Sequence, residues 1–259
     1  MLIKRKSIEK EESSRPARKP KYAPVTLSEQ NGVRYLHFGT EWVQGAMRMR
    51  KPDWLELEYA QQMMAWMLFV EQPRRIAQLG LGTAALTKFC YRQFPKAQVR
   101  AIELNPSVIA ICNSMFKLPP NDERLTVSEM DALDFVNDST NHATLDALQV
   151  DLYDATARGP VLDSADFYVA CSACLAPHGI VTVNLFGDHP SYARNIKAMK
   201  FAFDRVICLP EVHDGNVVAI GFKTKPTLDF EYLVARAAQI VSATKLPAQS
   251  WINGLKNSH

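Results

Sequence analysis

The chain has 259 residues, 47% hydrophobic and 22% charged, a composition typical of a folded globular protein. Its longest uninterrupted apolar run, residues 63–70, is far shorter than the roughly 20 residues that a membrane-spanning helix needs. The first residues are charged rather than apolar, which argues against a secretory signal, and the five cysteines are scattered. We therefore expect a cytoplasmic protein with no disulfide framework and no membrane contact.

The net charge of +3 is unevenly distributed. Residues 1–21 carry eight Lys or Arg and three Glu, which gives +5, so the remaining residues carry −2. Because residues 1–22 lack apolar periodicity, we expect a disordered basic tail and interpret it as a solubilising extension. The alternative is a nucleic-acid contact through counterion release. No aromatic residue interrupts the charges before Tyr22, so nucleic acid is not the expected partner.

Residues 23–52 are predicted to form a small N-terminal β-element. Asn31-Gly32 separates two short apolar segments, 25–27 and 33–38, a pattern typical of a hairpin. Residues 55–69 then favour one helix, because apolar side chains dominate and neither Gly nor Pro interrupts them. The methionines of this helix are expected in the core.

From residue 73 onward, predicted strands and helices alternate. The strands cover 75–79, 98–103, 125–128, 147–151 and 180–185, and the helices cover 84–93, 106–116, 132–136 and 164–175. A helix near 192–203 precedes two strands, 206–209 and 216–222, whose short connection favours an antiparallel pair. The rhythm predicts an α/β fold with a mostly parallel sheet covered by helices on both faces. We assign residues 53–225 to this domain and residues 226–259 to a C-terminal surface helix, 228–246, and a tail.

Polar residues follow the predicted strands at the end where such sheets bind ligands. Gly80 and Gly82 follow the first strand, and a Gly-x-Gly turn into a helix allows close approach of a ligand to free N–H groups. Glu103 follows the second strand, where a carboxylate can accept both hydroxyls of a ribose. Asp131 follows the third strand and has two interpretations, an acceptor for an adenine amino group and a cap for the helix beginning at Ala132.

Two carboxylates, Asp151 and Asp154, follow the fourth predicted strand. Asp is rarely buried without a partner, so the pair predicts a cation-attracting mouth in which one carboxylate serves as general base. The alternative is that Asp154 only caps a turn. Cys171-x-x-Cys174 lies inside a predicted helix without a second ligand pair, so we interpret both cysteines as packing residues and predict no metal site.

The ordered set of motifs resembles the spermidine synthases, which are polyamine aminopropyltransferases, and within them a divergent bacterial spermidine synthase-like group. The motifs are Gly80-x-Gly82, Glu103, Asp131, Asp151-x-x-Asp154, Gly159-Pro160 and Asp166-Phe167-Tyr168. The resemblance spans residues 25–223. It implies a methyltransferase-type, Rossmann-like sheet of seven strands, mostly parallel with the last strand antiparallel, and a homodimer.

The resemblance also implies the reaction, which is transfer of an aminopropyl group from decarboxylated S-adenosylmethionine to a polyamine. The sulfonium nucleoside would be a co-substrate rather than a tightly bound cofactor. The implied site residues are Gly80, Gly82, Glu103, Asp131 and Ala132 for the nucleoside, Asp151 as the catalytic base, and Asp154, Tyr59 and Gln44 for the amine.

The chain departs from this family in the part that would bind the amine. Thr83 stands where the family's glycine loop usually carries Asp, Ala60-Gln61 replaces His-Glu, and Val212-His213 replaces Tyr-Pro. The alternatives are therefore a small-molecule methyltransferase that uses S-adenosylmethionine and a non-catalytic nucleoside-binding homologue. A nicotinamide-dependent dehydrogenase ranks below them because it leaves the two aspartates unexplained.

Overall fold

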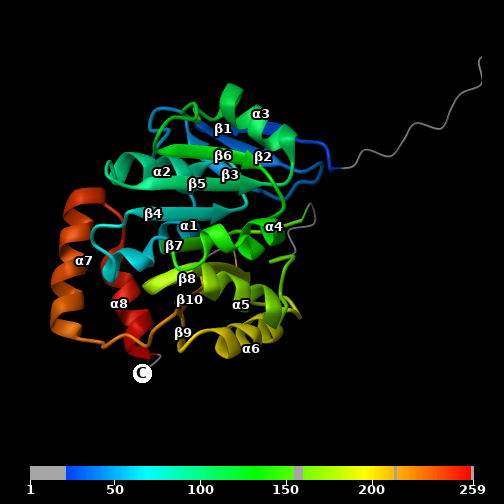
Figure 1. Cartoon of the computed structure of the whole chain (residues 1–259). Coiled ribbons are helices and arrows are strands. Elements are labelled where there is room, and N and C mark those ends of the chain that lie inside the picture. Colours follow the sequence, from blue (N-terminus) through cyan, green and yellow to red (C-terminus); the bar gives the residue numbers. More distant parts are fainter. Residues whose placement is uncertain (1–21, 155–159, 213–214, 258–259) are drawn as a thin grey trace, which may run out of the picture.

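A seven-stranded β-sheet organises the chain, whose computed structural model describes residues 22–154, 160–212 and 215–257 (Figure 1). Its strand order is β6-β5-β4-β7-β8-β10-β9. The strands are β4 (Arg75–Leu79), β5 (Gln98–Glu103), β6 (Leu125–Glu129), β7 (Leu145–Val150), β8 (Leu175–Phe186), β9 (Arg205–Cys208) and β10 (Asn216–Phe222). Only β10 runs against its neighbours, β8 and β9. The predicted methyltransferase-type sheet is confirmed.

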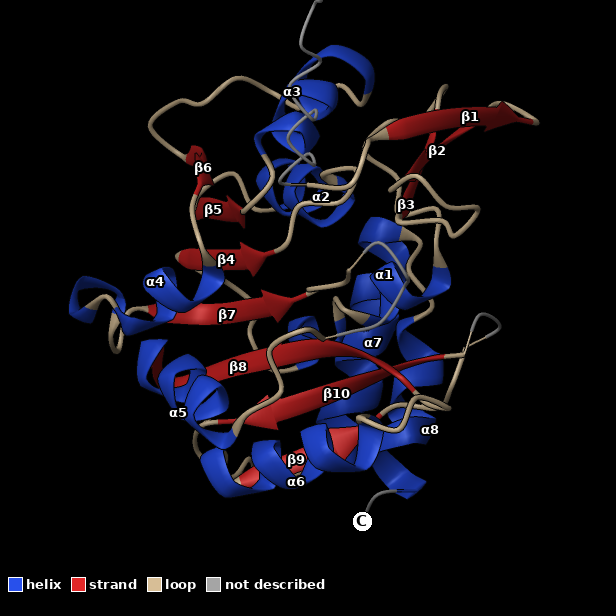
Figure 2. Cartoon of the chain, turned by 90° about the vertical axis from the view of Figure 1, so that its right-hand side faces the viewer, coloured by secondary structure: helices blue, strands red, loops and turns tan. Residues whose placement is uncertain are grey.

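Helices cover both faces of this sheet, as the alternating pattern predicted (Figure 2). One face packs against α4 (Ala132–Asn137), α5 (Ala165–Cys174) and α6 (Tyr192–Ala202), and the other against α2 (Ala85–Gln93) and α3 (Pro106–Met115) together with the C-terminal helices. Adjacent residues of a strand contribute to opposite clusters, as Ile76 and Ala77 do in β4. The strands are therefore buried on both sides, which explains their nearly continuous apolar sequence.

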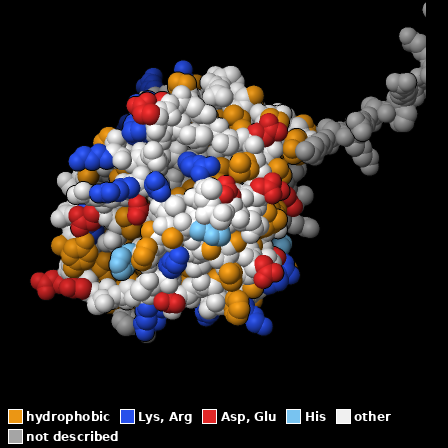
Figure 3. All heavy atoms as spheres, viewed as in Figure 1, with side chains coloured by type: hydrophobic (Ala, Val, Ile, Leu, Met, Phe, Trp, Pro, Cys, Tyr) orange, Lys and Arg blue, Asp and Glu red, His pale blue; other side chains and the backbone are white. Residues whose placement is uncertain are grey.

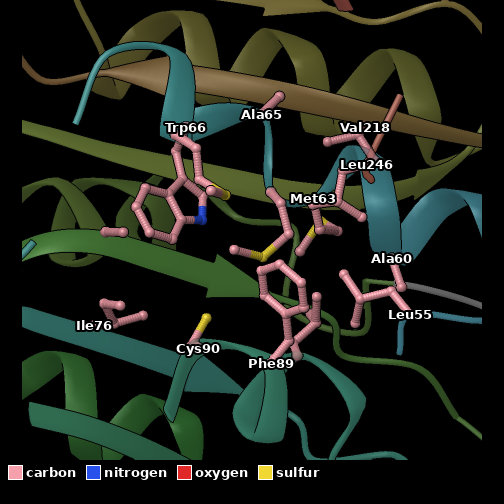
Figure 4. Close-up of a cluster of buried hydrophobic side chains, with 14 of the residues drawn as sticks. Leu55, Ala60, Met63, Ala65, Trp66, Ile76, Phe89, Cys90, Val218 and Leu246 are labelled. Carbon is pink, nitrogen blue, oxygen red and sulfur yellow. The ribbon is translucent and has the colours of Figure 1, made fainter. Parts of the chain in front are cut away.

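The predicted single helix over residues 55–69 is wrong. The segment forms α1 (Glu58–Gln62) and a separate 3-10 turn, η1 (Ala65–Leu68). At the break, the carbonyl of Met63 accepts hydrogen bonds from Thr182 Oγ1 (3.0 Å) and Gln149 Nε2 (3.5 Å) on the sheet. The sheet's buried polar side chains thus take up a carbonyl that a continuous helix would use itself. The methionines and Trp66 lie in the core, as expected (Figure 4).

The C-terminal segment contains two helices rather than the predicted helix and tail. α7 (Phe230–Thr244) ends at Lys245, which has a left-handed φ of 65°, and α8 (Ala248–Asn257) follows. α8 contains Gly254, although glycine is a poor helix former. In the structure, a Cβ at this position would lie 2.7 Å from Pro210 Cδ, so the glycine allows α8 to pack closely beside β9.

The boundary between α5 and β8 also differs from prediction. β8 begins at Leu175, five residues before the expected start at Ile180, because Leu175 already pairs with Leu145 of β7 ahead of a register shift. Cys171 and Cys174 are buried free thiols in α5, as expected.

The N-terminal element is a three-stranded antiparallel sheet of β1 (Thr26–Gln30), β2 (Val33–His37) and β3 (Gly45–Arg48). The Asn31-Gly32 hairpin is confirmed, and β3 is additional to it. This small sheet is fastened to the end of α3. Arg34 of β2 donates to the carbonyl of Met115 (2.5 Å), and the buried Lys88 of α2 donates to that of Phe116 (2.7 Å). Cations at a helix C-terminus are favoured by the helix dipole.

The surface view shows acidic and basic side chains interspersed, so the face in Figure 3 has no continuous basic surface. Within the described ranges, no helix combines the length and apolar character needed to span a membrane. The expected basic tail, apart from Tyr22, lies outside the described residues.

The docking of α8 can be tested by removing Trp251, whose side chain is fully buried. We expect Trp251→Ala to lower the free energy of unfolding by about 3–5 kcal/mol, because the substitution leaves a large cavity. Denaturant unfolding measures the change. Asn253→Ala, at an exposed position of the same helix, should stay within about 0.5 kcal/mol. Equal effects of the two substitutions would show that α8 does not pack as described.

Candidate functional site

A cavity of about 930 Å³ lies where β4, β5 and β7 end, beside the loop that joins β2 to β3. This is the edge of the sheet at which the sequence placed the ligand site (Figure 2). Seven predicted residues line it: Gln44, Tyr59, Gly80, Gly82, Glu103, Asp151 and Asp154. Its size is within the range of pockets that bind small molecules.

Gly80 makes the junction between β4 and β7 possible. Its φ is +87°, and a Cβ added there would lie 2.1 Å from the carbonyl oxygen of Asp151. The sequence explained this glycine by close approach to a ligand; the structure shows that its nearest constraint is the backbone of the neighbouring strand's end. The loop then turns into α2 through Ala84, which has a left-handed φ of 56°.

Glu103 joins the glycine loop to the loop after β5. Its Oε2 accepts a hydrogen bond from the backbone N–H of Leu81 (2.9 Å), and its Oε1 accepts one from Asn105 (2.8 Å). Burial raises the pKa of the Glu103 carboxyl, and these N–H groups act against that shift. Each carboxylate oxygen keeps acceptor capacity for a further donor, so Glu103 can still bind ligand hydroxyl groups.

Asp151 is held by two side-chain donors. Asn184 Nδ2 donates to Oδ1 at 2.9 Å, and the Tyr59 hydroxyl donates to Oδ2 at 3.3 Å. Burial raises the pKa of the Asp151 carboxyl above its usual range, and the bonds from Asn184 and Tyr59 oppose this rise. A carboxylate with a raised pKa that lines a cavity is suited to accept a proton.

Gln44 and Asp154 meet at the side of the cavity formed by the N-terminal element. The Gln44 side chain donates to the carbonyl oxygen of Asp154 at 3.2 Å. This contact ties the β2–β3 loop to the segment that follows β7. Asp154 is exposed, whereas Asp151 is partly buried, so the two aspartates of the motif occupy different environments.

Asp131 and Ala132 are not among the residues that line the cavity. Asp131 caps α4, with Oδ1 accepting from the N–H of Leu133 at 2.8 Å, so the capping interpretation is confirmed. Asp131 nevertheless follows Met130, whose N–H donates to the carbonyl oxygen of Glu103 (3.0 Å). Contact of Asp131 and Ala132 with an adenine stays a prediction.

The departing residues 60, 61 and 83 are not among those that line the large cavity, although two of them border it. Thr83 is buried and its hydroxyl donates to the Ala46 carbonyl at 3.3 Å. Ala60 is buried, and the Gln61 side chain donates to the Leu55 carbonyl at 2.8 Å. Thr83 and Ala60 line a small adjoining cavity of about 20 Å³, which shares Asp151 with the large one and has room for one water molecule. His213 lies outside the described residues.

The charged side chains among the described lining residues are all acidic: Glu41, Glu103, Asp151 and Asp154. Exposed apolar side chains accompany them, with Trp42 the most exposed at 55%. A cavity with negative charges and aromatic faces favours organic cations. Within the described residues, no group of three His, Cys, Asp or Glu is arranged to hold a metal ion.

Sequence reasoning missed several lining residues, chiefly Glu41, Trp42, Tyr153, Asn184 and Asn216. Two of them carried a recognisable signal. Asn184 is polar within a strand that is mostly apolar, and Asn216 opens the last predicted strand directly after Gly215. Trp42 lies in an irregular loop, for which the sequence pattern makes no specific prediction.

The Gly80 junction can be tested against a glycine that has similar backbone geometry. Gly80→Ala combines a positive φ with a clash against the Asp151 backbone. In Gly32→Ala the φ is +75°, but no atom lies within 4 Å of the added Cβ, so only strain of about 1–2 kcal/mol is expected. In denaturant unfolding, the free energy of unfolding of Gly80→Ala should be lower than that of Gly32→Ala by about 1–3 kcal/mol. Similar free energies of unfolding for the two variants would show that the Asp151 backbone does not require glycine at position 80.

Comparison with known proteins identifies the family of the chain. Residues 58–230 match the Spermine/spermidine synthase domain family. A polyamine aminopropyltransferase of Chromobacterium violaceum is 31% identical over 237 residues, which cover 91% of this chain and 90% of that protein.

Two solved structures share the fold. A probable spermidine synthase from Corynebacterium glutamicum has a TM-score of 0.73 at 18% identity, with 92% of each chain covered. Human Methyltransferase-like protein 13 in complex with SAH has a TM-score of 0.63 at 20% identity, with 77% of this chain and 93% of that chain covered. At such identities these structures support the fold alone. The family match and the 31% identical relative identify the family. The chain belongs to the spermine/spermidine synthase domain family.

Proposed function

We propose that this protein is an aminopropyltransferase of polyamine biosynthesis, which transfers an aminopropyl group from decarboxylated S-adenosylmethionine to an amine acceptor. Family membership supports the reaction class. The observation that carries the proposal is Asp151, held by Asn184 and Tyr59 in a cavity whose charged side chains, among the described residues, are all acidic. Both proposed substrates are cations, a sulfonium and an ammonium, which such a cavity attracts.

In this proposal, the nucleoside binds at the ends of β4 and β5. Glu103 accepts hydrogen bonds from the ribose hydroxyls while its backbone donors keep the carboxylate in place. Gly80 and Gly82 line the cavity beside it, where a bulkier loop would fill the space of the sulfonium. Asp131 and Ala132 are assigned to the adenine.

Asp151 is proposed to prepare the nucleophile. A polyamine nitrogen has a pKa near that of Lys, about 10, so it is mostly protonated and cannot attack at neutral pH. Asp151 attracts the ammonium and accepts a proton from nitrogen. The nitrogen lone pair then forms a bond to the propyl carbon next to sulfur, while the carbon–sulfur bond breaks and its electrons stay on sulfur. Methylthioadenosine leaves as a neutral thioether. The positive charge on the sulfonium thus makes sulfur a good leaving group without further activation.

Asp154, Tyr59 and Gln44 are assigned to the amine. All three line the cavity, and Tyr59 contacts Asp151 directly. The proposal names an amine as acceptor without choosing one polyamine, because Thr83, Ala60 and Gln61 depart from the residues that the resemblance implies. A homodimer and a cytoplasmic location stay predictions.

A methyltransferase that uses S-adenosylmethionine is the second candidate. It is favoured by the uncharged, buried Thr83 in place of an acidic residue and by the shared fold of the human methyltransferase. Mass spectrometry separates the two functions after purified protein is incubated with each sulfonium donor and a panel of amines. Methylthioadenosine with an aminopropylated amine supports our proposal. S-adenosylhomocysteine with a methylated product would replace it, and nucleoside binding without either product would indicate a non-catalytic homologue.

Asp151→Asn should lower turnover by at least about 100-fold, because the amide cannot accept the proton. The pH dependence provides a second measurement. The deprotonated carboxylate is the active form, so kcat/KM should fall as pH decreases through the pKa of Asp151. Burial raises that pKa, so the fall should begin at higher pH than the ordinary Asp value of about 4 allows. Asp204→Asn, at an exposed position outside the cavity, is the matched control and should keep normal turnover. Near-normal activity of Asp151→Asn would overturn the assigned role.

A further inference from the structure

Two buried asparagines stand in series behind Asp151. Asn184 Nδ2 donates to Asp151 Oδ1 at 2.9 Å, and Asn216 Nδ2 donates to Asn184 Oδ1 at 2.9 Å. Asn184 is 2% exposed and Asn216 9%, so most of each side chain is shielded although both line the cavity. The chain of donors therefore runs in one direction, from Asn216 through Asn184 to the carboxylate.

The pairing of β8 with β10 sets the two amides side by side. Asn184 pairs with Val218, and Asn216 pairs with Phe186, in antiparallel register. The two asparagines are thus diagonal neighbours, within reach of each other on the same face of the sheet. The hydroxyl of Tyr153 donates to the backbone carbonyl of Asn184 at 3.3 Å and adds a contact on the cavity side.

The direction of this chain matters because an amide group has two different ends. If the Asn184 amide were turned by half a rotation, its oxygen would face the ionised Asp151 oxygen, and its NH₂ group would face the NH₂ group of Asn216. Both contacts would be repulsive, and the buried groups would lose their hydrogen bonds. The Asp151 carboxylate and Asn216 Nδ2 therefore favour the same orientation of the Asn184 amide.

We propose that Asn184 and Asn216 form a positioning relay that occupies Oδ1 of Asp151 and leaves Oδ2 as the oxygen that accepts the substrate proton. This inference rests on the proposed function of Asp151 as a base. In the reaction, one N–H bond of the amine breaks and its proton goes to Oδ2, a new N–C bond forms, and the C–S bond electrons leave with sulfur. Tyr59 stays as the longer contact to Oδ2, at 3.3 Å.

Other ionisable groups also face this carboxylate or its cavity. Tyr59 comes from α1, Tyr153 and Asp154 from the segment after β7, Glu103 from β5, and Glu41 from the β2–β3 loop. The acidic groups among them act on Asp151 as negative charges, whereas Asn184 and Asn216 are neutral. Removal of either asparagine thus changes hydrogen bonding without adding charge, provided that the replacement is also neutral.

The test is a double-mutant cycle with Asn184→Leu, Asn216→Leu and the double variant, in the full chain. Each single substitution should lower kcat by about 10- to 100-fold, the range expected when a reacting group is misplaced by up to about 1 Å. If Asn216 acts through Asn184, the double variant should be no slower than Asn184→Leu alone. Asn216→Asp should be slower than Asn216→Leu, because the carboxylate accepts from Asn184 and turns its amide around.

A readout independent of turnover is the pKa of Asp151, followed by NMR titration of its labelled carboxyl carbon. The hydrogen bond from Asn184 lowers this pKa, so loss of either asparagine should raise it, and the acid limb of kcat/KM should move to higher pH. Thermal unfolding checks that each variant folds. Asn113→Asp, at an exposed position on α3, is the control for the charge that Asn216→Asp adds. It should change neither the pKa of Asp151 nor the acid limb of kcat/KM.

The outcomes distinguish this inference from the function on which it rests. A wild-type protein without aminopropyl transfer overturns the proposed function, and a raised pKa in folded variants would still support the relay. With an active wild type, additive losses in the double variant, or an unchanged pKa and acid limb in Asn216→Leu, overturn the relay.

Discussion

The site depends on the alignment of three parallel strands at their carboxyl ends. The N–H of Gly80 donates to Ile102 of β5 at 2.8 Å, and the N–H of Asp151 donates to Leu79 of β4 at 2.9 Å. These bonds extend the sheet just past its regular strands and bring the glycine loop, Glu103 and Asp151 to one cavity. The alignment requires the missing side chain at Gly80, because any Cβ there would overlap the backbone of Asp151. The positions of the Glu103 and Asp151 side chains thus depend on close packing of the backbone at Gly80.

The two ends of the cavity differ in how they are built. At the end proposed for the nucleoside, the Glu103 carboxylate is fixed by backbone N–H groups, which every residue except proline supplies. At the end proposed for the amine, Asp151 is fixed by side chains from α1 and β8, with a side chain of β10 behind them. Such side-chain contacts can change between relatives while the fold persists.

The sequence predicted the sheet and the strand-end carboxylates because both are local features. Short apolar segments indicate the alternation of strands and helices. Glu103 and Asp151 lie directly at strand ends. The features that escaped prediction depend on contacts between distant segments. The helix over 55–69 breaks because Thr182, 119 residues from Met63, bonds its carbonyl. The asparagine pair forms only when β8 and β10 align, and α8 packs against α7, β9 and η1.

The account's central claim is that one acidic cavity holds a nucleoside at Glu103 and an amine at Asp151. A crystal structure with methylthioadenosine and a polyamine tests it most directly. The account predicts both ribose hydroxyls within about 3 Å of the Glu103 carboxylate, an amine nitrogen at a similar distance from Asp151 Oδ2, and the thioether sulfur between them. A nucleoside bound elsewhere on the chain, or an amine with no contact to Asp151, would contradict it.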